Sequence, residues 1–131
     1  MNPTVYGSNH IALEVADPEA AAAFYQEVFG LERLREGEGQ AFLRLGPHQF
    51  LAIFNGPEGT PPHCDVTRHF GIIVRDDAEI AEVKRRLQAR GIELLPPFAC
   101  DFRDPWGNRI QVVDLSVCSP WWATALEYAA A

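Results

Sequence analysis

Two histidines occupy matching positions in an internal repeat of the chain. Residues 9–17 (NHIALEVAD) have a counterpart in residues 68–76 (RHFGIIVRD), and in both segments a histidine opens a short strand-like pattern that an aspartate closes. The repeat relates these two histidines, His10 and His69, to each other. Because the neutral imidazole ring is the commonest protein ligand of metal ions, the pair is a candidate metal site.

The alternation of side chains along a strand predicts where these histidines point. The apolar residues of each segment form one row, which is expected to pack against a helix and leaves His10 and His69 on the opposite face. Each histidine is followed on that face by a small residue, Ala12 or Gly71, and in the last predicted strand Gln111 shares the same face. Two imidazoles and an amide oxygen can hold a divalent cation and leave coordination positions open for a substrate.

A structural role is the competing interpretation. A lone histidine in a strand is more often structural than a ligand, and two histidines at matching repeat positions bring the metal and structural interpretations to about equal support. The amide oxygen of Gln111 is neutral and a weaker donor than a carboxylate, so this set is expected to bind an ion less tightly.

A helix and three strands are predicted after each histidine. The helices are 18–29, which starts after Asp17-Pro18 and ends at Gly30, and 77–90, which starts after Asp76 and ends at Gly91. The predicted strands are 31–36, 40–45 and 49–55, then 93–97, 99–103 and 109–114.

This order predicts an α+β fold of two βαβββ modules, at about 8–56 and 67–115, followed by a tail at 116–131. We expect one domain in which the modules form a curved, barrel-like mixed sheet with the helices outside.

Length, charge and composition exclude several classes of protein. The chain has 131 residues, enough for one domain, and a net charge of −7, which disfavours nucleic acid as a partner. No apolar stretch approaches the ~20 residues needed to span a bilayer, and the N-terminus does not resemble a signal peptide. We therefore expect a cytoplasmic protein with no membrane partner, whose three cysteines are reduced thiols.

The repeat, its two histidines and the segment 104–111 (DPWGNRIQ) resemble the vicinal oxygen chelate superfamily. This group includes glyoxalase I, extradiol dioxygenases, methylmalonyl-CoA epimerase, fosfomycin resistance transferases and bleomycin resistance proteins. The resemblance runs from about Ser8 to Asp114. It implies that His10 and His69 are metal ligands, that Gln111 stands where the family usually has glutamate, and that the cofactor is a divalent ion of Fe, Mn, Zn or Ni.

The resemblance also implies what the protein does. We expect a divalent-metal-dependent enzyme of the lyase, isomerase or dioxygenase type, acting on a small substrate chelated through adjacent oxygens. A complete glyoxalase I site is not expected, because its fourth-strand ligand position holds Phe50 or Leu51. The alternative is a metal-free sequestering protein of the bleomycin resistance type, which fits the acidic charge. A fosfomycin-type thiol transferase is disfavoured, because the last-strand glutamate of that family is missing.

Three further residues are candidates for binding the substrate. Phe42 and Arg44 share one face of their predicted strand, and Arg44 either receives an anionic group or is simply an exposed residue. Trp121 is expected to cover the cavity mouth or to lie in a dimer contact, and the apolar tail predicts a homodimer. Arg109 lies near a turn, where exposure to solvent is expected.

Overall fold

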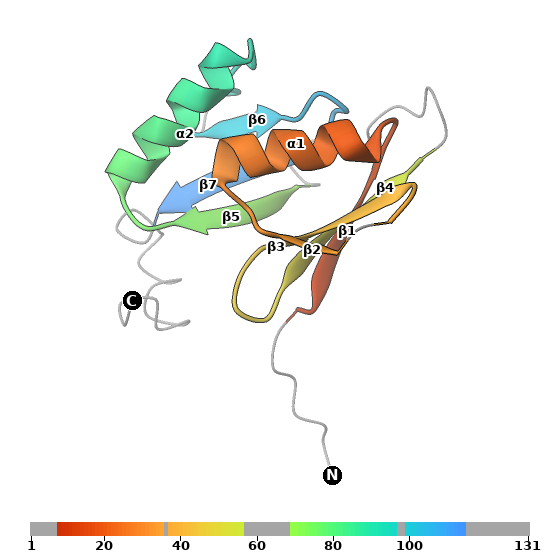
Figure 1. Cartoon of the computed structure of the whole chain (residues 1–131). Helices are drawn as coiled ribbons and strands as arrows, with labels where there is room; N and C mark the ends of the chain where they lie inside the picture. The colour runs from red at the N-terminus through yellow and green to blue at the C-terminus, as the bar shows by residue number, and fades with distance from the viewer. Residues whose placement is uncertain (1–7, 36, 57–68, 97–98, 115–131) are drawn as a thin grey trace. The chain divides into compact units, whose positions relative to one another are not determined.

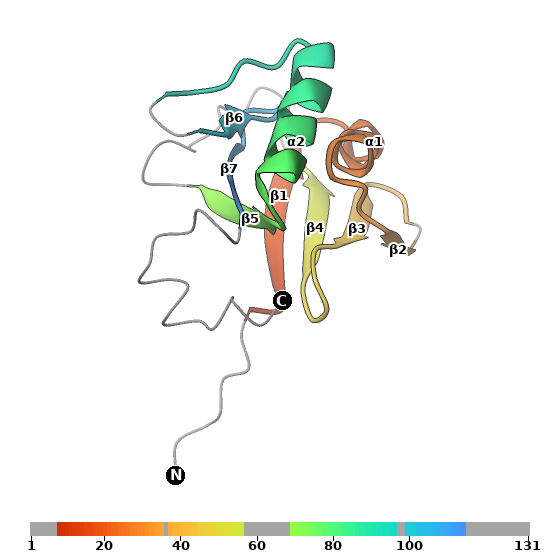
Figure 2. The same cartoon turned by 90° about the vertical axis from the view of Figure 1, so that its left-hand side faces the viewer.

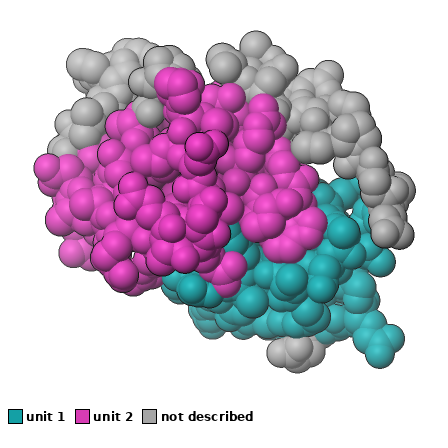
Figure 3. All heavy atoms as spheres, turned by 90° about the horizontal axis from the view of Figure 1, so that it is seen from above, with its two compact units in different colours: residues 1–60 teal, residues 61–131 magenta. Residues whose placement is uncertain are grey.

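The computed structural model describes residues 8–35, 37–56, 69–96 and 99–114 (Figure 1). The chain divides into two compact units, residues 1–60 and residues 61–131, which Figure 3 shows in different colours. Each unit contains one of the two predicted modules, and each is described by itself. The predicted tail at 116–131 lies outside the described residues.

The described residues of unit 1 form a four-stranded sheet and one helix. Its elements are β1 (His10–Val15), α1 (Pro18–Phe29), β2 (Arg33–Arg35), β3 (Gln40–Arg44) and β4 (Phe50–Asn55). The strand order is β1-β4-β3-β2, in which β1 pairs with β4 in parallel and the other pairs are antiparallel. The helix packs on β3 and β4, and no helix of the unit's described residues covers the other face of the sheet (Figures 1 and 2).

The bounds of α1 follow from its two caps. The side chain of Asp17 accepts a hydrogen bond from the backbone N–H of Ala20, at 3.1 Å. Pro18 occupies the first turn, where backbone N–H groups have no acceptor within the helix, so the lack of an N–H in proline breaks no helix hydrogen bond. Gly30 ends the helix in the left-handed region, with φ 68°, and its N–H donates to the carbonyl of Gln26 at 2.8 Å. The predicted helix 18–29 is therefore confirmed.

Asp17→Ala is expected to lower the free energy of unfolding by about 1 kcal/mol, because one helix N–H loses its acceptor. Asp17→Asn is the control, since it removes the charge and keeps an acceptor oxygen, and it should retain most of the stability. Urea unfolding followed by circular dichroism measures both changes. Equal losses in the two variants would contradict a capping role.

In unit 2, the part of the chain that the structure describes forms a three-stranded sheet and one helix. Its elements are β5 (Phe70–Val74), α2 (Asp77–Ala89), β6 (Asp101–Arg103) and β7 (Arg109–Asp114). The strand order is β5-β7-β6; β7 pairs in parallel with β5 and antiparallel with β6. At the start of α2, which packs on β7, the side chain of Asp76 accepts from the N–H of Glu79 at 3.0 Å. Together the two units confirm the α+β fold.

The strand predicted at 93–97 is wrong in this structure. Its described residues, 93–96, form only an isolated bridge between Leu94 and Phe102, and β6 is shorter than the predicted 99–103. Pro96 and Pro97 explain the loss, because proline has no N–H to donate to a neighbouring strand. The second module is therefore βαββ with one bridge in the described residues.

Within the described ranges, neither helix has the length and apolar character needed to cross a membrane.

Candidate functional site

One face of the sheet in unit 1 carries the residues predicted to face the substrate. Along β1, Leu13 and Val15 are buried, whereas His10, Ala12 and Glu14 are exposed. On β3 the same alternation buries Ala41 and Leu43 and leaves Phe42 half-buried and Arg44 exposed. The predicted alternation therefore agrees with the structure, and His10, Phe42 and Arg44 lie on the face away from the buried row.

Four aromatic rings cluster on this face. The ring of His10 stacks on that of Phe50, with centroids 4.9 Å apart and planes at 15°. Phe42 makes edge contacts with Phe50 and Phe54, at 5.9 and 6.0 Å between centroids. We call His10, Phe42, Phe50 and Phe54 the aromatic patch. It offers ring faces to a planar or apolar group of a ligand.

The middle row of the same face is formed by small residues. His10 pairs with Phe50 in the register of β1 and β4, and two positions further on Ala12 pairs with Ala52. Phe42 pairs with Ala52 from β3, and Ala52 retains only 1% of its accessible surface, whereas Ala12 is exposed.

The imidazole of His10 keeps one nitrogen available. Its Nδ1 lies 2.8 Å from Oδ1 of Asn9, and an amide oxygen can only accept a hydrogen bond. In the neutral tautomer that donates this bond, Nδ1 carries the proton and Nε2 keeps a lone pair. A second residue that fixes the ring in this way is typical of histidines that bind metals.

Arg44 already has an ionic partner. Its Nε donates to Oε2 of Glu32 at 2.8 Å, and both side chains are largely exposed. An anionic substrate group at Arg44 would compete with Glu32. A second cation, Arg35, lies with its guanidinium carbon 5.5 Å from the centre of the Phe42 ring.

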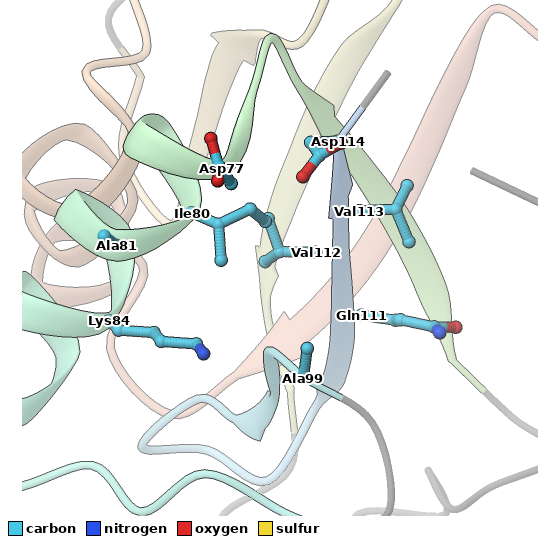
Figure 4. Close-up of a pocket in the computed structure, with 9 residues that line it drawn as sticks. All are labelled: Asp77, Ile80, Ala81, Lys84, Ala99, Gln111, Val112, Val113 and Asp114. Carbon is cyan, nitrogen blue, oxygen red and sulfur yellow. The ribbon is translucent and has the colours of Figure 1, made fainter. Parts of the chain in front are cut away.

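In unit 2, Gln111 lies on the side of β7 that faces away from α2. Ile110 and Val112 are buried, whereas Gln111 and Val113 are half-buried. Figure 4 shows the side chains of Gln111 and Val113 pointing away from the helix. Gln111 pairs with Gly71 of β5, and His69 is exposed immediately before that strand.

A cavity of about 360 Å³ lies between α2 and β7. Ile80 and Val112 point toward one another across it, and Lys84 lines one end (Figure 4). Gln111 is among the residues that line the cavity, although its amide end points away from α2.

Arg109 is buried, and the expectation that it is exposed to solvent is wrong. Its side chain retains 7% of its accessible surface and forms an ion pair with Asp101, which retains 2%. Nε of Arg109 donates to Oδ2 of Asp101 at 2.8 Å, and Nη2 donates to the same oxygen. The pairing of β6 with β7 puts both residues on the face of Gln111, because Asp101 is the direct partner of Gln111.

A hydrogen-bonded turn fixes this register. Asp104 Oδ1 accepts from the N–H groups of Trp106 and Asn108, at 3.0 and 2.8 Å, and Oδ2 accepts from the side chain of Asn108 at 2.9 Å. Gly107 has φ 90°, which favours glycine. The motif at 104–108 therefore positions β7 and has a structural role in this unit.

The described cysteine is not an activated nucleophile. Cys100 retains 1% of its accessible surface, and this burial raises the pKa of its thiol to about 11. The group therefore stays protonated at neutral pH. Within the described ranges, no group of three or more His, Cys, Asp or Glu side chains is close enough to hold a metal ion.

The predicted site is only partly described. His10, Phe42 and Arg44 share a face in unit 1, and Gln111 lies on the face of β7 away from α2 in unit 2. The meeting of His10 with His69 and Gln111 stays a prediction. Trp121 lies outside the described residues, so its role and the homodimer stay predictions too.

Phe50 and Phe54 are not among the binding residues predicted from the sequence. The alternation FLAIF along β4 indicates that they share a face.

Comparison with known proteins decides the family. The model of the Glyoxalase/Bleomycin resistance protein/Dioxygenase superfamily matches residues 7–112. The chain belongs to this superfamily. The resemblance inferred from the repeat and the 104–111 segment is therefore confirmed.

Three similar proteins illustrate the range of the superfamily. Uncharacterized protein PA2024 of Pseudomonas aeruginosa is 29% identical over 126 residues, covering 85% of this chain and 88% of that protein. A possible glyoxalase from Bacillus cereus is 28% identical, with a TM-score of 0.66 over 82% of this chain and 98% of that chain. The fosfomycin resistance protein FosX from Listeria monocytogenes, solved with Mn(II) and sulfate, is 22% identical, with a TM-score of 0.66 over 83% of this chain and 90% of that chain. At that identity, FosX supports the fold alone.

Proposed function

We propose that this superfamily member is a divalent-metal-dependent enzyme acting on a small substrate chelated through adjacent oxygens, with His10, His69 and Gln111 as the ligands of the ion. The observation that carries the proposal is the placement of two of these residues. His10 in unit 1 and Gln111 in unit 2 each lie on the sheet face away from the buried row that packs toward the helix.

The donor set fits a divalent ion of the first transition series. Imidazole nitrogens suit Fe, Zn and Ni, and an amide carbonyl oxygen also suits Mn. The Nε2 nitrogen of His10 is available because the hydrogen bond to Asn9 uses Nδ1. The side chain of Gln111 makes no hydrogen bond to another described residue, so its amide oxygen can accept a cation. When bound, such an ion would act as a Lewis acid toward the substrate oxygens.

The chain's own residues would bind and orient the substrate. The aromatic patch offers apolar ring surface beside His10, and Ala12, the next residue of β1 on that face, is small and exposed. A planar substrate held against Phe42 and Phe50 would present its oxygens beside the His10 ring. A lyase, an isomerase or a dioxygenase reaction is compatible with this arrangement.

Metal binding to purified protein tests this proposal. Titration with Mn(II), Zn(II), Ni(II) and Fe(II) in calorimetry is expected to show one ion per chain, with binding abolished in His10→Ala and in His69→Ala. His48→Ala is the matched control, because His48 is exposed in the loop before β4 and should leave the affinity unchanged. Wild-type protein that binds no divalent ion, or equal affinities in all variants, would refute the metal site.

The aromatic patch also supports a second candidate, a metal-free protein that sequesters a small cationic ligand. Ring faces attract cations, and the net charge of −7 favours such a ligand. In this case a planar organic cation should bind wild-type protein in the absence of any metal, and Phe50→Leu should weaken that binding while metal ions have no effect on it.

A further inference from the structure

The buried carboxylate of Asp101 has one oxygen without a partner. Both donors from Arg109 reach Oδ2, whereas Oδ1 is buried and has no hydrogen bond. A buried acceptor without a donor is unfavourable, because burial removes its hydrogen bonds to water and no hydrogen bond within the protein replaces them. A donor that can reach Oδ1 would therefore stabilise the site.

Gln111 is the neighbour that carries such a donor. Asp101 is flanked across the sheet by Gln111 on one side and, on the other, by Leu95, whose N–H donates to the Asp101 carbonyl at 2.7 Å. The side chain of Leu95 has no polar atom, whereas the amide of Gln111 has two N–H donors.

The register brings these two side chains close. The N–H of Val112 donates to the carbonyl of Cys100 at 2.8 Å, so the next pair along, Asp101 and Gln111, is a non-hydrogen-bonded pair of the antiparallel ladder. Pairs of this kind have the shortest separation between their side chains, with Cβ atoms about 4.5–5.5 Å apart.

We propose that Asp101 is a positioning residue for Gln111: its Oδ1 accepts a hydrogen bond from Nε2 of Gln111 and so directs Oε1 of that amide toward the metal ion. The inference rests on the proposed function. An amide has one end that can bind a cation and one that cannot, and a neighbouring acceptor selects which end remains for the ion. Rotation of the half-buried Gln111 side chain makes the bond, since no described residue holds its amide elsewhere.

Arg109 completes this arrangement from the other side of the carboxylate. By donating twice to Oδ2, it holds the Asp101 side chain with Oδ1 as the remaining acceptor. A hydrogen bond to a charged carboxylate also polarises the Gln111 amide, which increases the electron density on Oε1 and makes this oxygen a stronger ligand for a cation. Asp101 thus offsets part of the weakness of a neutral ligand.

Amide NMR spectra of the metal-free protein test the hydrogen bond itself. The Gln111 side-chain resonances are assigned by their disappearance in Gln111→Glu. In wild-type protein one of these protons is expected downfield of the other glutamine side chains, and Asp101→Asn should abolish that shift. A Gln111 signal that is unaffected by Asp101→Asn would overturn the inference.

Mn(II) affinity tests the consequence. In Asp101→Asn, Arg109 selects the oxygen of the new amide, which leaves its NH₂ group where Oδ1 was and favours the wrong orientation of Gln111. We expect Mn(II) to bind at least tenfold more weakly. Asp114→Asn is the matched control: Asp114 is equally buried, at 2%, but lies on the opposite face of β7, and its loss should change the affinity less than twofold.

A second substitution separates positioning from simple structural support. Gln111→Glu in the Asp101→Asn background should restore Mn(II) binding, because either oxygen of a carboxylate binds the ion and the new amide can donate to the other. Equal losses in Asp101→Asn and Asp114→Asn, or no rescue, would overturn the inference. If Asp101→Asn does not fold, Asp101→Asn combined with Arg109→Gln removes the unpaired cation and is measured in its place.

These outcomes are distinct from failure of the proposed function. Wild-type protein that binds no Mn(II) refutes the metal site, and the role of Asp101 toward a metal falls with it. Wild-type protein that binds Mn(II) and loses it in His10→Ala, but keeps full affinity in Asp101→Asn, supports the site and refutes the role of Asp101.

Discussion

Arg109→Met is expected to lower the free energy of unfolding by about 3–5 kcal/mol, because it leaves a buried carboxylate without its counterion. Asp101 retains 2% of its side-chain surface, so water cannot replace the lost guanidinium without opening the sheet. Removal of one partner from a buried ion pair has this large effect even where the intact pair adds little net stability. Urea unfolding at neutral pH, followed by circular dichroism, measures the change.

Two further variants show whether burial is the cause. Arg44→Met breaks the exposed pair with Glu32, whose side chains retain 48% and 63% of their surface, and should change stability by less than about 1 kcal/mol. Asp101→Leu combined with Arg109→Met removes both buried charges and should recover most of the stability lost in Arg109→Met. If Arg109→Met and Arg44→Met are equally mild, Arg109 is accessible to water in solution.

Gln111→Glu is expected to tighten divalent metal binding at least tenfold. The change adds a negative charge at a predicted ligand position. At an effective dielectric constant near 20, a unit charge ~2–4 Å from the ion is worth several kcal/mol before desolvation is subtracted, and a tenfold gain needs only about 1.4 kcal/mol.

Calorimetric titration with Mn(II) and Zn(II) measures this gain. Gln88→Glu is the control for net charge, because Gln88 is exposed near the end of α2 and should leave the affinity unchanged. An unchanged affinity in Gln111→Glu, or a less stable protein with no gain in affinity, would remove Gln111 from the ligand set. The face around it would then be a metal-free binding surface.

Local sequence determines the elements that the prediction located well. The helix 18–29 is correct at both ends because its boundaries depend on adjacent residues: a side-chain acceptor at Asp17, proline at the first helical position, and a left-handed Gly30. The alternation of buried and exposed positions along β1 and β3 depends only on the period of a strand.

Longer-range pairing explains what the sequence did not predict. The burial of Arg109 depends on Asp101, eight positions earlier on another strand, and becomes visible only once the β6–β7 register is known. The strand expected at 93–97 is short and contains two prolines, which cannot donate a hydrogen bond to a neighbouring strand. The position of His10 relative to His69 depends on both units, which no local pattern determines.

The parallel pairing of first and last strands has a consequence for how the chain is made. In unit 1 the sheet partner of β1 is β4, and His10 pairs with Phe50; in unit 2, Phe70 pairs with Ile110. Each opening strand therefore cannot pair until about forty further residues have been synthesised. Each pairing also costs the conformational entropy of closing a loop of that length. During this delay the apolar row of β1 is exposed, so the nascent chain is most open to chaperones, and to aggregation, before Asn55 emerges.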